Sequence, residues 1–190
     1  MSRFKALLAS KSESGSSIAW TDLGTDDLMA GDVLVRVTHT TINYKDGLAL
    51  TGKAPIIRRW PLIPGIDFAG EVISSDSAEF KTGDRVVLNG WGVGESHYGG
   101  YSERARVKAD WLVKLPDTFS NAEAMAVGTA GYTAMLCILA LEAHGVTPAA
   151  GPVLVTGAAG GGGAGAGAAA VQAGLYRFPF TGPAGEGGVV

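Results

Sequence analysis

The chain has 190 residues, of which 46% are hydrophobic, enough to bury a core in one large or two small domains. It carries 15 Lys and Arg against 18 Asp and Glu, a formal net charge of -3. It has no basic run that would favour nucleic acid as a partner. Cys137 is the only cysteine, which excludes an intramolecular disulfide and any zinc site built on several thiolates.

The amino-terminal residues, MSRFKALLAS, lack the apolar stretch and small-residue cleavage site of a secretory signal. We also expect no segment that is long and apolar enough to span a membrane. The sequence therefore predicts a cytoplasmic protein with no membrane partner.

The chain up to about residue 118 has the pattern of a β-rich domain. In VLVRV, residues 33–37, valines alternate with other residues as in a half-buried strand. RVVL, residues 85–88, follows a Gly-Asp turn signal, and ARVKADWLVKLP ends the strand region at Pro116. We predict that residues 1–119 form the first domain.

The pattern changes at Ser120, which makes an S-x-x-E capping box with Glu123 ahead of AMAVGTAGYTAMLCILALEAHG. We expect one long helix that ends at Gly145. VLVT, residues 153–156, is typical of a fully buried parallel strand. A β-rich domain followed by helix, strand, glycine turn and helix is a two-domain α/β architecture.

A glycine-rich loop follows this strand, and VTGAAGGGG fits the pattern A-x-G-x-x-G ahead of a helix expected near Ala164. Such glycines let the backbone approach a pyrophosphate, while the helix presents free N–H groups to it. A flexible linker is the alternative. The predicted cofactor-binding residues of the loop are Thr156, Gly157, Ala158, Ala159, Gly160, Gly161 and Gly163.

The last 40 residues hold 13 of the 29 glycines and only two charged residues. Gly165 and Gly167 would each weaken a helix by about 1 kcal/mol relative to alanine. No second strand with an acidic or basic ribose selector is identified in YRFPFTGPAGEGGVV. Residues 120–190 are therefore predicted to begin a nucleotide-binding domain that is truncated or uncertain beyond about residue 165, with a flexible tail as the alternative.

Three motifs, PLIPGIDFAGEV, KTGDRVVLNGWGVGESHYGGYSERARV and GTAGYTAML, resemble the medium-chain dehydrogenase/reductase superfamily. With NYKDGLALTGK and IIRRWP, they are similar to its quinone oxidoreductase branch, which contains NADPH-dependent acryloyl-CoA reductases. The resemblance covers roughly residues 3–163. It implies a GroES-like catalytic domain, then a doubly wound (Rossmann) domain that binds NADPH, and a homodimer.

The resemblance also argues against a catalytic metal. In zinc alcohol dehydrogenases of the superfamily a cysteine stands at the place of Asn43, and Gly-His-Glu stands at residues 65–67, which are Gly-Ile-Asp here. Isoleucine has no donor atom, and a catalytic zinc needs about three protein ligands. The histidines are widely separated in the sequence: His39, His97 and His144.

The chemistry that the resemblance implies is hydride transfer from NADPH to an electron-poor alkene, followed by protonation. Tyr44 is the candidate proton donor or carbonyl-orienting group, because a phenol donates while neutral at pH 7. Asn43 is expected to fix nicotinamide or substrate, and Asp46 closes the N-x-x-D signature of the catalytic segment. The resemblance places Thr129, in GTAGYTA, beside the nicotinamide.

Each of these residues also has a structural interpretation. Asn43 would cap a turn or helix, Tyr44 would be a core aromatic, and Thr129 would allow close helix packing. For Asp46 we favour the structural role of a hydrogen-bond acceptor.

Candidate substrate-binding residues lie in two segments. Lys53, Arg58 and Arg59 either bind the phosphates of a CoA thioester or are simply solvated charges. Trp91 and His97 belong to WGVGESHYGGY, a composition that suits a loop bordering a cleft. His97 is expected at the surface, with a proton relay as the alternative.

Three functions follow in order of preference. The first is NADPH-dependent, zinc-independent reduction of a 2-enoyl-CoA of the acryloyl-CoA type. The second is a broad quinone or enone reductase, which would use the same cofactor and cleft without a site for CoA phosphates. The third is a non-catalytic binding protein that retains the fold.

Overall fold

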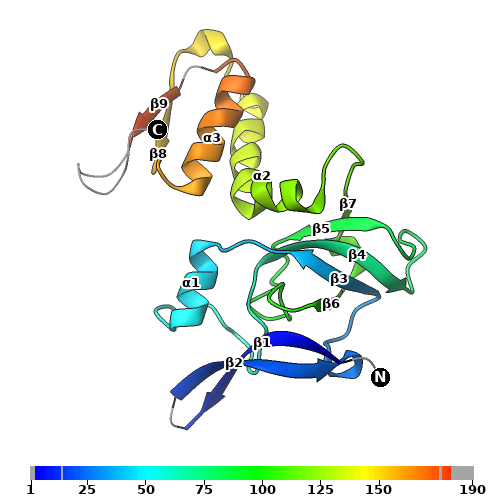
Figure 1. Ribbon diagram of the computed structural model, residues 1–190. Coiled ribbons are helices and arrows are strands. Elements are labelled where there is room, and N and C mark those ends of the chain that lie inside the picture. Colours follow the sequence, from blue (N-terminus) through cyan, green and yellow to red (C-terminus); the bar gives the residue numbers. More distant parts are fainter. Residues whose placement is uncertain (1–2, 14, 176, 181–190) are drawn as a thin grey trace. The chain divides into compact units, whose positions relative to one another are not determined.

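The computed structural model describes residues 3–13, 15–175 and 177–180 (Figure 1). The chain divides into two compact units, residues 1–128 and residues 129–190, and each is described by itself. The domain boundary predicted after residue 119 falls within unit 1 and stays a prediction.

Unit 1 is built from antiparallel strands. A hairpin of β1 (Arg3–Ser12) and β2 (Gly15–Gly24) accompanies a five-stranded sheet in the order β6-β3-β4-β5-β7. The strands of this sheet are β3 (Val33–His39), β4 (Asp67–Ser75), β5 (Arg85–Asn89), β6 (Arg104–Val107) and β7 (Val113–Lys114). The short helices are η1 (Thr25–Asp27), α1 (Tyr44–Thr51) and η2 (Ala109–Trp111).

The predicted alternation in β3 is confirmed. Val33 and Val35 are fully buried in the main core cluster of unit 1, whereas Arg36 is exposed and pairs with Glu71 of β4. Because side chains alternate along a strand, one face of the sheet forms the core and the other meets solvent. The strand predicted at residues 85–88 is β5.

The predicted helix is α2 (Asn121–Ala143), and both of its predicted ends are confirmed. The backbone N–H and hydroxyl of Ser120 donate to the Glu123 carboxylate at 2.8 and 2.7 Å, and the Glu123 N–H donates to the Ser120 hydroxyl. Gly145, with φ +79°, ends the helix as expected of a left-handed C-terminal glycine.

The prediction of one uninterrupted helix is wrong. Gly128 has φ 51° and ψ −162°, and this non-helical residue divides α2 into two helices. A side chain is almost never found in that backbone region, so the kink needs glycine.

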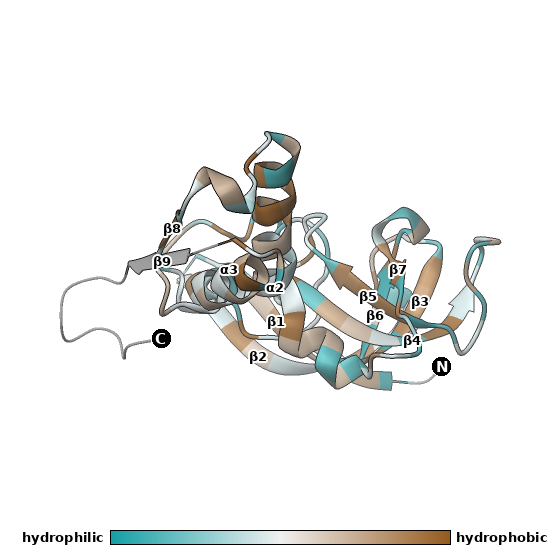
Figure 2. Ribbon diagram, turned by 90° about the horizontal axis from the view of Figure 1, so that it is seen from above, coloured by the Kyte–Doolittle hydropathy of each residue, from teal (hydrophilic) through white to brown (hydrophobic). Residues whose placement is uncertain are grey.

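The expectation that no segment could span a membrane is also wrong by length and composition. α2 has 23 residues and a mean hydropathy of 1.8 over its most apolar window, of which 22% is buried. Figure 2 shows hydrophobic colouring over several turns of α2. The same criteria are met by core helices of globular proteins, so this helix alone is weak evidence for a membrane.

Unit 2 continues α2 with η3 (Pro148–Ala150), β8 (Val153–Thr156), α3 (Gly161–Gln172) and β9 (Arg177–Phe180). The strands β8 and β9 pair in parallel, so β8, α3 and β9 form a β-α-β unit. The sequence analysis identified no second strand with a ribose selector, and the structure shows that a second strand, β9, does follow the loop. The expected ribose selector would follow this strand and lies outside the described residues.

One further expectation in unit 2 needs correction, and one is confirmed. β8 is not fully buried, because Leu154 is exposed while Val153 packs on the cluster around Ile138. The helix expected near Ala164 is confirmed as α3, which begins at Gly161. It packs on α2, since a Cβ added at Gly165 would make an ordinary contact of 3.5 Å with the Cβ of Ala134. Close packing offsets the weak helix propensity.

Candidate functional site

The candidate site of unit 1 lies where β3 ends and β4 begins. The residues His39 and Ala69 are paired in the sheet, so the segment that leaves β3 toward α1 passes the start of β4 at Asp67. The hydroxyl of Thr40 donates to the backbone carbonyl of Asp67 at 2.7 Å. The topology thereby brings Asn43 of the N-x-x-D signature next to Asp67 of PGIDFAG.

Asn43 and Asp46 form the start of α1. Asn43 is the N-cap residue, and its backbone N–H donates to the Asp46 carboxylate at 2.9 Å. The other carboxylate oxygen of Asp46 accepts the N–H of Ile66 at 3.1 Å. The structural interpretations of Asn43 as a cap and of Asp46 as an acceptor are confirmed, whereas their catalytic roles stay predictions.

The side-chain amide of Asn43 is held by two neighbours. Its Nδ2 donates to Thr41 Oγ1 at 2.8 Å and to Asp67 Oδ2 at 3.2 Å, while Thr41 Oγ1 donates to Asp67 Oδ1 at 2.6 Å. Asp67 is fully buried, so its charge depends on these donors. We call Thr41, Asn43, Asp46 and Asp67 the buried network.

Burial shapes the electrostatics of the network. Asp46 is 1% exposed, and this burial raises its pKa above 3.8. The hydrogen bonds from Asn43 and Ile66 lower the pKa, and the charge of Asp67 raises it further, but burial has the largest effect. Tyr101 donates its hydroxyl to the Thr41 carbonyl at 3.1 Å. Burial and the nearby Asp46 carboxylate raise the pKa of Tyr101 well above 10.0, so its phenol keeps its proton.

Tyr44 follows the buried network directly and is 85% exposed. The interpretation of Tyr44 as a core aromatic is therefore wrong within unit 1, since its position in the first turn of α1 leaves the ring exposed. Gly128 lies on the other flank of the network, since a Cβ on it would be 3.0 Å from the Thr41 Cγ2 and 3.6 Å from the Asp67 carboxylate.

A cavity of about 930 Å³ in unit 1 adjoins the network. Tyr101 and Ile42 line it together with the apolar side chains of Leu7, Trp20 and Leu50. An apolar cavity beside a few polar groups is the usual form of a small-molecule site.

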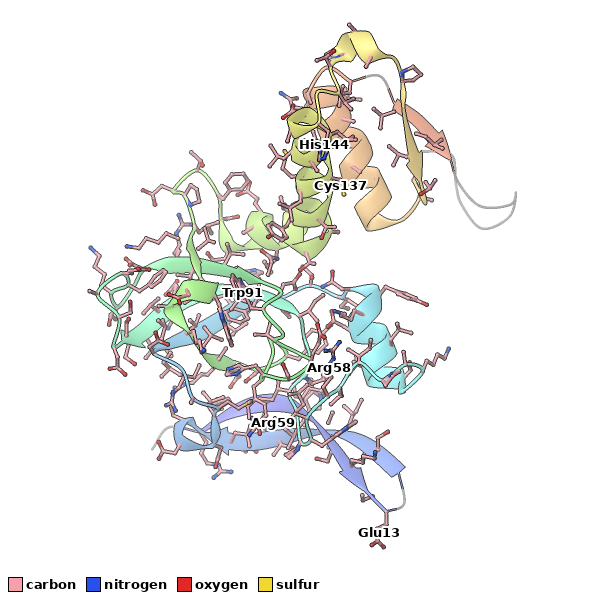
Figure 3. The ribbon with its side chains drawn as sticks, turned by 180° about the vertical axis from the view of Figure 1, so that it is seen from behind. Glu13, Arg58, Arg59, Trp91, Cys137 and His144 are labelled. Atoms are coloured by element: carbon pink, nitrogen blue, oxygen red, sulfur yellow. The ribbon has the colours of Figure 1, made fainter. Side chains whose placement is uncertain are left out.

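The predicted substrate loop follows β5. The expectation that His97 lies at the surface is wrong, because it is 9% exposed, sits edge-on to Trp111 and bonds through Nε2 to the Arg106 carbonyl at 2.8 Å. Burial lowers its pKa below 6.5. Trp91 of the same loop is exposed (Figure 3).

The three cations predicted to bind CoA phosphates lie in different surroundings. Arg58 pairs with Glu95 at 3.7 Å, and Glu95 also holds Lys45 at 2.6 Å. Lys53 lines a separate cavity of about 390 Å³, and Arg59 acts on the pKa of His97 through its charge. The interpretation of these cations as a single phosphate site therefore has no geometric support.

The nucleotide loop lies in unit 2, between β8 and α3. Gly157 has φ +63°, and a Cβ on Gly163 would lie 2.1 Å from the Gly157 carbonyl oxygen. Gly160 is the N-cap of α3, so the free N–H groups of the helix open onto the loop. This cradle fits a dinucleotide pyrophosphate, and only glycine fits at position 163.

The remaining predicted residues of unit 2 are placed as follows. Ala158 is buried, whereas Thr156, Ala159 and Gly161 are exposed at the loop. Thr129 follows the kink of α2 and begins unit 2.

No group of three or more His, Cys, Asp or Glu that could hold a metal occurs in residues 3–13, 15–175 and 177–180. The absence of a catalytic metal stays a prediction. Sequence reasoning missed Thr41, Asp67 and Tyr101 as members of the site. Asp67 and Tyr101 could have been found from the motifs PGIDFAG and HYGGY. Both motifs place a polar residue among glycines, which let neighbouring backbone segments approach closely.

Comparisons with known proteins agree with this geometry. Residues 29–117 match the alcohol dehydrogenase GroES-like domain. The acrylyl-CoA reductase AcuI of Ruegeria pomeroyi is 54% identical over 160 residues, which are 83% of this chain and 48% of that protein. The chain therefore spans about half the length of this relative.

Solved structures show the same similarity. The YhdH oxidoreductase from Salmonella enterica in complex with NADP has a TM-score of 0.91 and 49% identity over 95% of this chain and 56% of that one. The Bacillus subtilis protein YhfP with NAD bound has a TM-score of 0.87 and 44% identity, over 94% of this chain and 54% of that one. The predicted α/β fold class is confirmed, and the chain belongs to the medium-chain dehydrogenase/reductase superfamily with a GroES-like domain at residues 29–117.

Proposed function

We propose that this protein is a zinc-independent reductase that transfers a hydride from NADPH to the double bond of a 2-enoyl-CoA of the acryloyl-CoA type. The observation that carries the proposal is the 54% identity to an acrylyl-CoA reductase over 160 residues, a span that includes the buried network. The NADP bound to a solved relative supports the cofactor.

The loop of unit 2 would hold the cofactor. Backbone N–H groups at the start of α3 and the glycines from Gly157 to Gly163 would bind the pyrophosphate, and Thr129 would lie at the nicotinamide end. Bound NADPH supplies the hydride. Binding and orientation remain the work of the protein.

The buried network would orient the reacting groups. Because Thr41 and Asp67 fix the plane of the Asn43 amide, this side chain is preorganised to bind the nicotinamide or the thioester. Reduction adds a hydride at the β-carbon of the substrate and a proton at its α-carbon. Tyr44 would provide that proton from its exposed hydroxyl.

NADPH oxidation tests the proposal. Purified protein with NADPH should lose nicotinamide absorbance when acryloyl-CoA is added, and more slowly with benzoquinone. Tyr44→Phe should lower kcat by about 10²- to 10⁴-fold if the phenol is the proton donor, while Asn43→Ala should act through KM and kcat together.

The competing functions give different results in the same assay. Faster oxidation with benzoquinone than with acryloyl-CoA would favour a quinone or enone reductase. No oxidation with either acceptor would favour a non-catalytic binding protein.

The same proposal includes a homodimer in the cytoplasm with small-molecule ligands. Sedimentation of the purified protein at twice the monomer mass would support the dimer. A monomer at working concentration would remove it from the proposal.

A further inference from the structure

The loop that follows β5 is rigidly held by its neighbours. Val93 is fully buried, and the Gly90 N–H donates to the Ile66 carbonyl at 3.0 Å. A Cβ on Gly94 would lie 2.9 Å from the backbone of Gly65, so two loops touch there. Glu95 of the loop also forms ion pairs with Lys45 of α1 and with Arg58, which precedes β4.

This rigid loop presents one indole to solvent. Trp91 is 62% exposed and has φ +55°, and it is the only residue besides glycine with positive φ among those described. A bulky side chain rarely adopts this left-handed backbone. Strained residues of this kind concentrate at ligand-binding sites, where the surrounding structure enforces them.

The indole rests on a second aromatic layer. Trp111 is stacked beside Trp91, with ring centroids 6.3 Å apart and planes at 12°. His97 supports Trp111 edge-on at 5.1 Å and is itself fixed by the Arg106 carbonyl. We call Trp91, Trp111 and His97 the indole platform.

Positive charge flanks this platform. Lys108 Nζ lies 5.6 Å from the centroid of the Trp111 ring. Burial lowers the pKa of His97, and the charge of Lys108 adds to this effect. An exposed aromatic face with a cation nearby matches a planar ring that carries phosphates.

We propose that the indole platform binds the nucleotide end of the CoA thioester, with adenine stacked on Trp91 and phosphates facing Lys108. This inference rests on the proposed function. A neutral quinone would stack on the ring but gain nothing from Lys108, so the charge of Lys108 favours the nucleotide.

The position of the platform suits this role. Asn89, the last residue of β5, pairs with Asp67 of the buried network, and Trp91 comes two residues later. Strand spacings put Trp91 on the order of 10 Å from Asp67. The flexible pantetheine arm, which joins the nucleotide to the thioester, can span that distance in a bent conformation.

Titration with adenosine 3′,5′-bisphosphate tests the proposal by calorimetry and tryptophan fluorescence. Trp91→Gly should weaken binding by about 5- to 150-fold, the range for stacking of a base on an aromatic side chain. Glycine suits φ +55°, so this variant should fold. Trp91→Asn, which also tolerates a left-handed backbone, should give the same loss.

A matched pair of lysines separates specific charge from general charge. Lys108→Met should weaken binding several-fold and flatten its salt dependence. Lys114→Met should have no effect, although Lys114 Nζ lies equally 5.6 Å from the centroid of the Phe80 ring.

Three results would overturn the proposal. The first is no binding of adenosine 3′,5′-bisphosphate to the unaltered protein. The second is unchanged affinity in both Trp91 variants. The third is a loss of binding in Trp20→Phe alone, which would place the nucleotide in the cavity that Trp20 lines.

Activity distinguishes this inference from the proposed function. If the enzyme reduces acryloyl-CoA, Trp91→Gly should raise KM for acryloyl-CoA but not for acryloyl-pantetheine, which lacks the nucleotide. An equal rise in KM for both substrates would refute nucleotide binding at the platform but would leave the proposed function standing. Trp91-dependent nucleotide binding without any reduction would refute the proposed function alone.

Discussion

Alanine substitution at three glycines should change stability in three different ways, and Gly128 gives the largest loss. At φ 51° and ψ −162° a side chain costs about 1–3 kcal/mol. The added Cβ would also lie 3.0 Å from the Thr41 Cγ2, so the threonine that holds Asn43 must shift. For a protein of this size the expected fall in Tm is roughly 2–12 °C.

Two other glycines serve as matched controls for Gly128→Ala. Gly145 has φ +79° and nothing within 4 Å of an added Cβ, so Gly145→Ala should cost only the left-handed backbone energy of about 1–2 kcal/mol. Gly47 lies within α1, also with nothing within 4 Å. Gly47→Ala should therefore stabilise the protein by about 0.5–1 kcal/mol.

Urea unfolding and thermal melting followed by circular dichroism would measure all three variants. The expected order of stability is Gly47→Ala, unaltered protein, Gly145→Ala, Gly128→Ala. The reasoning is refuted if Gly128→Ala is as stable as the unaltered protein, because α2 would then run straight through residue 128 without a kink.

Two further substitutions test the carboxylate and the nucleotide loop. Because the pKa of Asp46 is raised above 3.8 in the folded state, the native state binds this proton more tightly than the unfolded chain, and the stabilising contribution is lost as pH rises through the folded pKa. The free energy of unfolding that Asp46→Asn loses relative to the unaltered protein should thus be largest at acid pH. Urea unfolding from about pH 4 to pH 7 would measure this difference, and a difference that does not change with pH would contradict the prediction. In the nucleotide loop, the Cβ of Gly163→Ala would lie 2.1 Å from the Gly157 carbonyl oxygen, so this variant should bind NADPH at least tenfold more weakly, a loss of about 1.4 kcal/mol. Gly162→Ala is the control and should bind NADPH normally, because nothing lies within 4 Å of its added Cβ. Equal NADPH affinities of the two variants in fluorescence titration would refute the role of the loop as a pyrophosphate cradle.

Local patterns predicted the elements well where one residue controls one feature. The alternation in residues 33–37 reports which face is buried, and the Ser120–Glu123 box and Gly145 mark the ends of α2. The kink at Gly128 was missed because the apolar pattern runs on through it, and Thr41, which a side chain at residue 128 would meet, is far away in the sequence. The second strand was missed because parallel pairing with β8, not a strong local pattern, defines β9.

The site shows the same limit. The N-x-x-D signature identified Asn43, Tyr44 and Asp46 from sequence alone, whereas Asp67 entered only as a position unsuited to zinc. The sheet register that brings Asp67 to the Asn43 amide is a long-range property. His97 was misplaced for the same reason, since its burial depends on Trp111 and Arg106 in a later part of the chain.

The central claim is the reduction of acryloyl-CoA by NADPH, and the direct measurement is product analysis after incubation of the purified protein with both compounds. We predict equimolar formation of propionyl-CoA and NADP, with loss of the product in Asn43→Ala. NADPH that stays unoxidised while acryloyl-CoA is recovered unchanged would contradict the account.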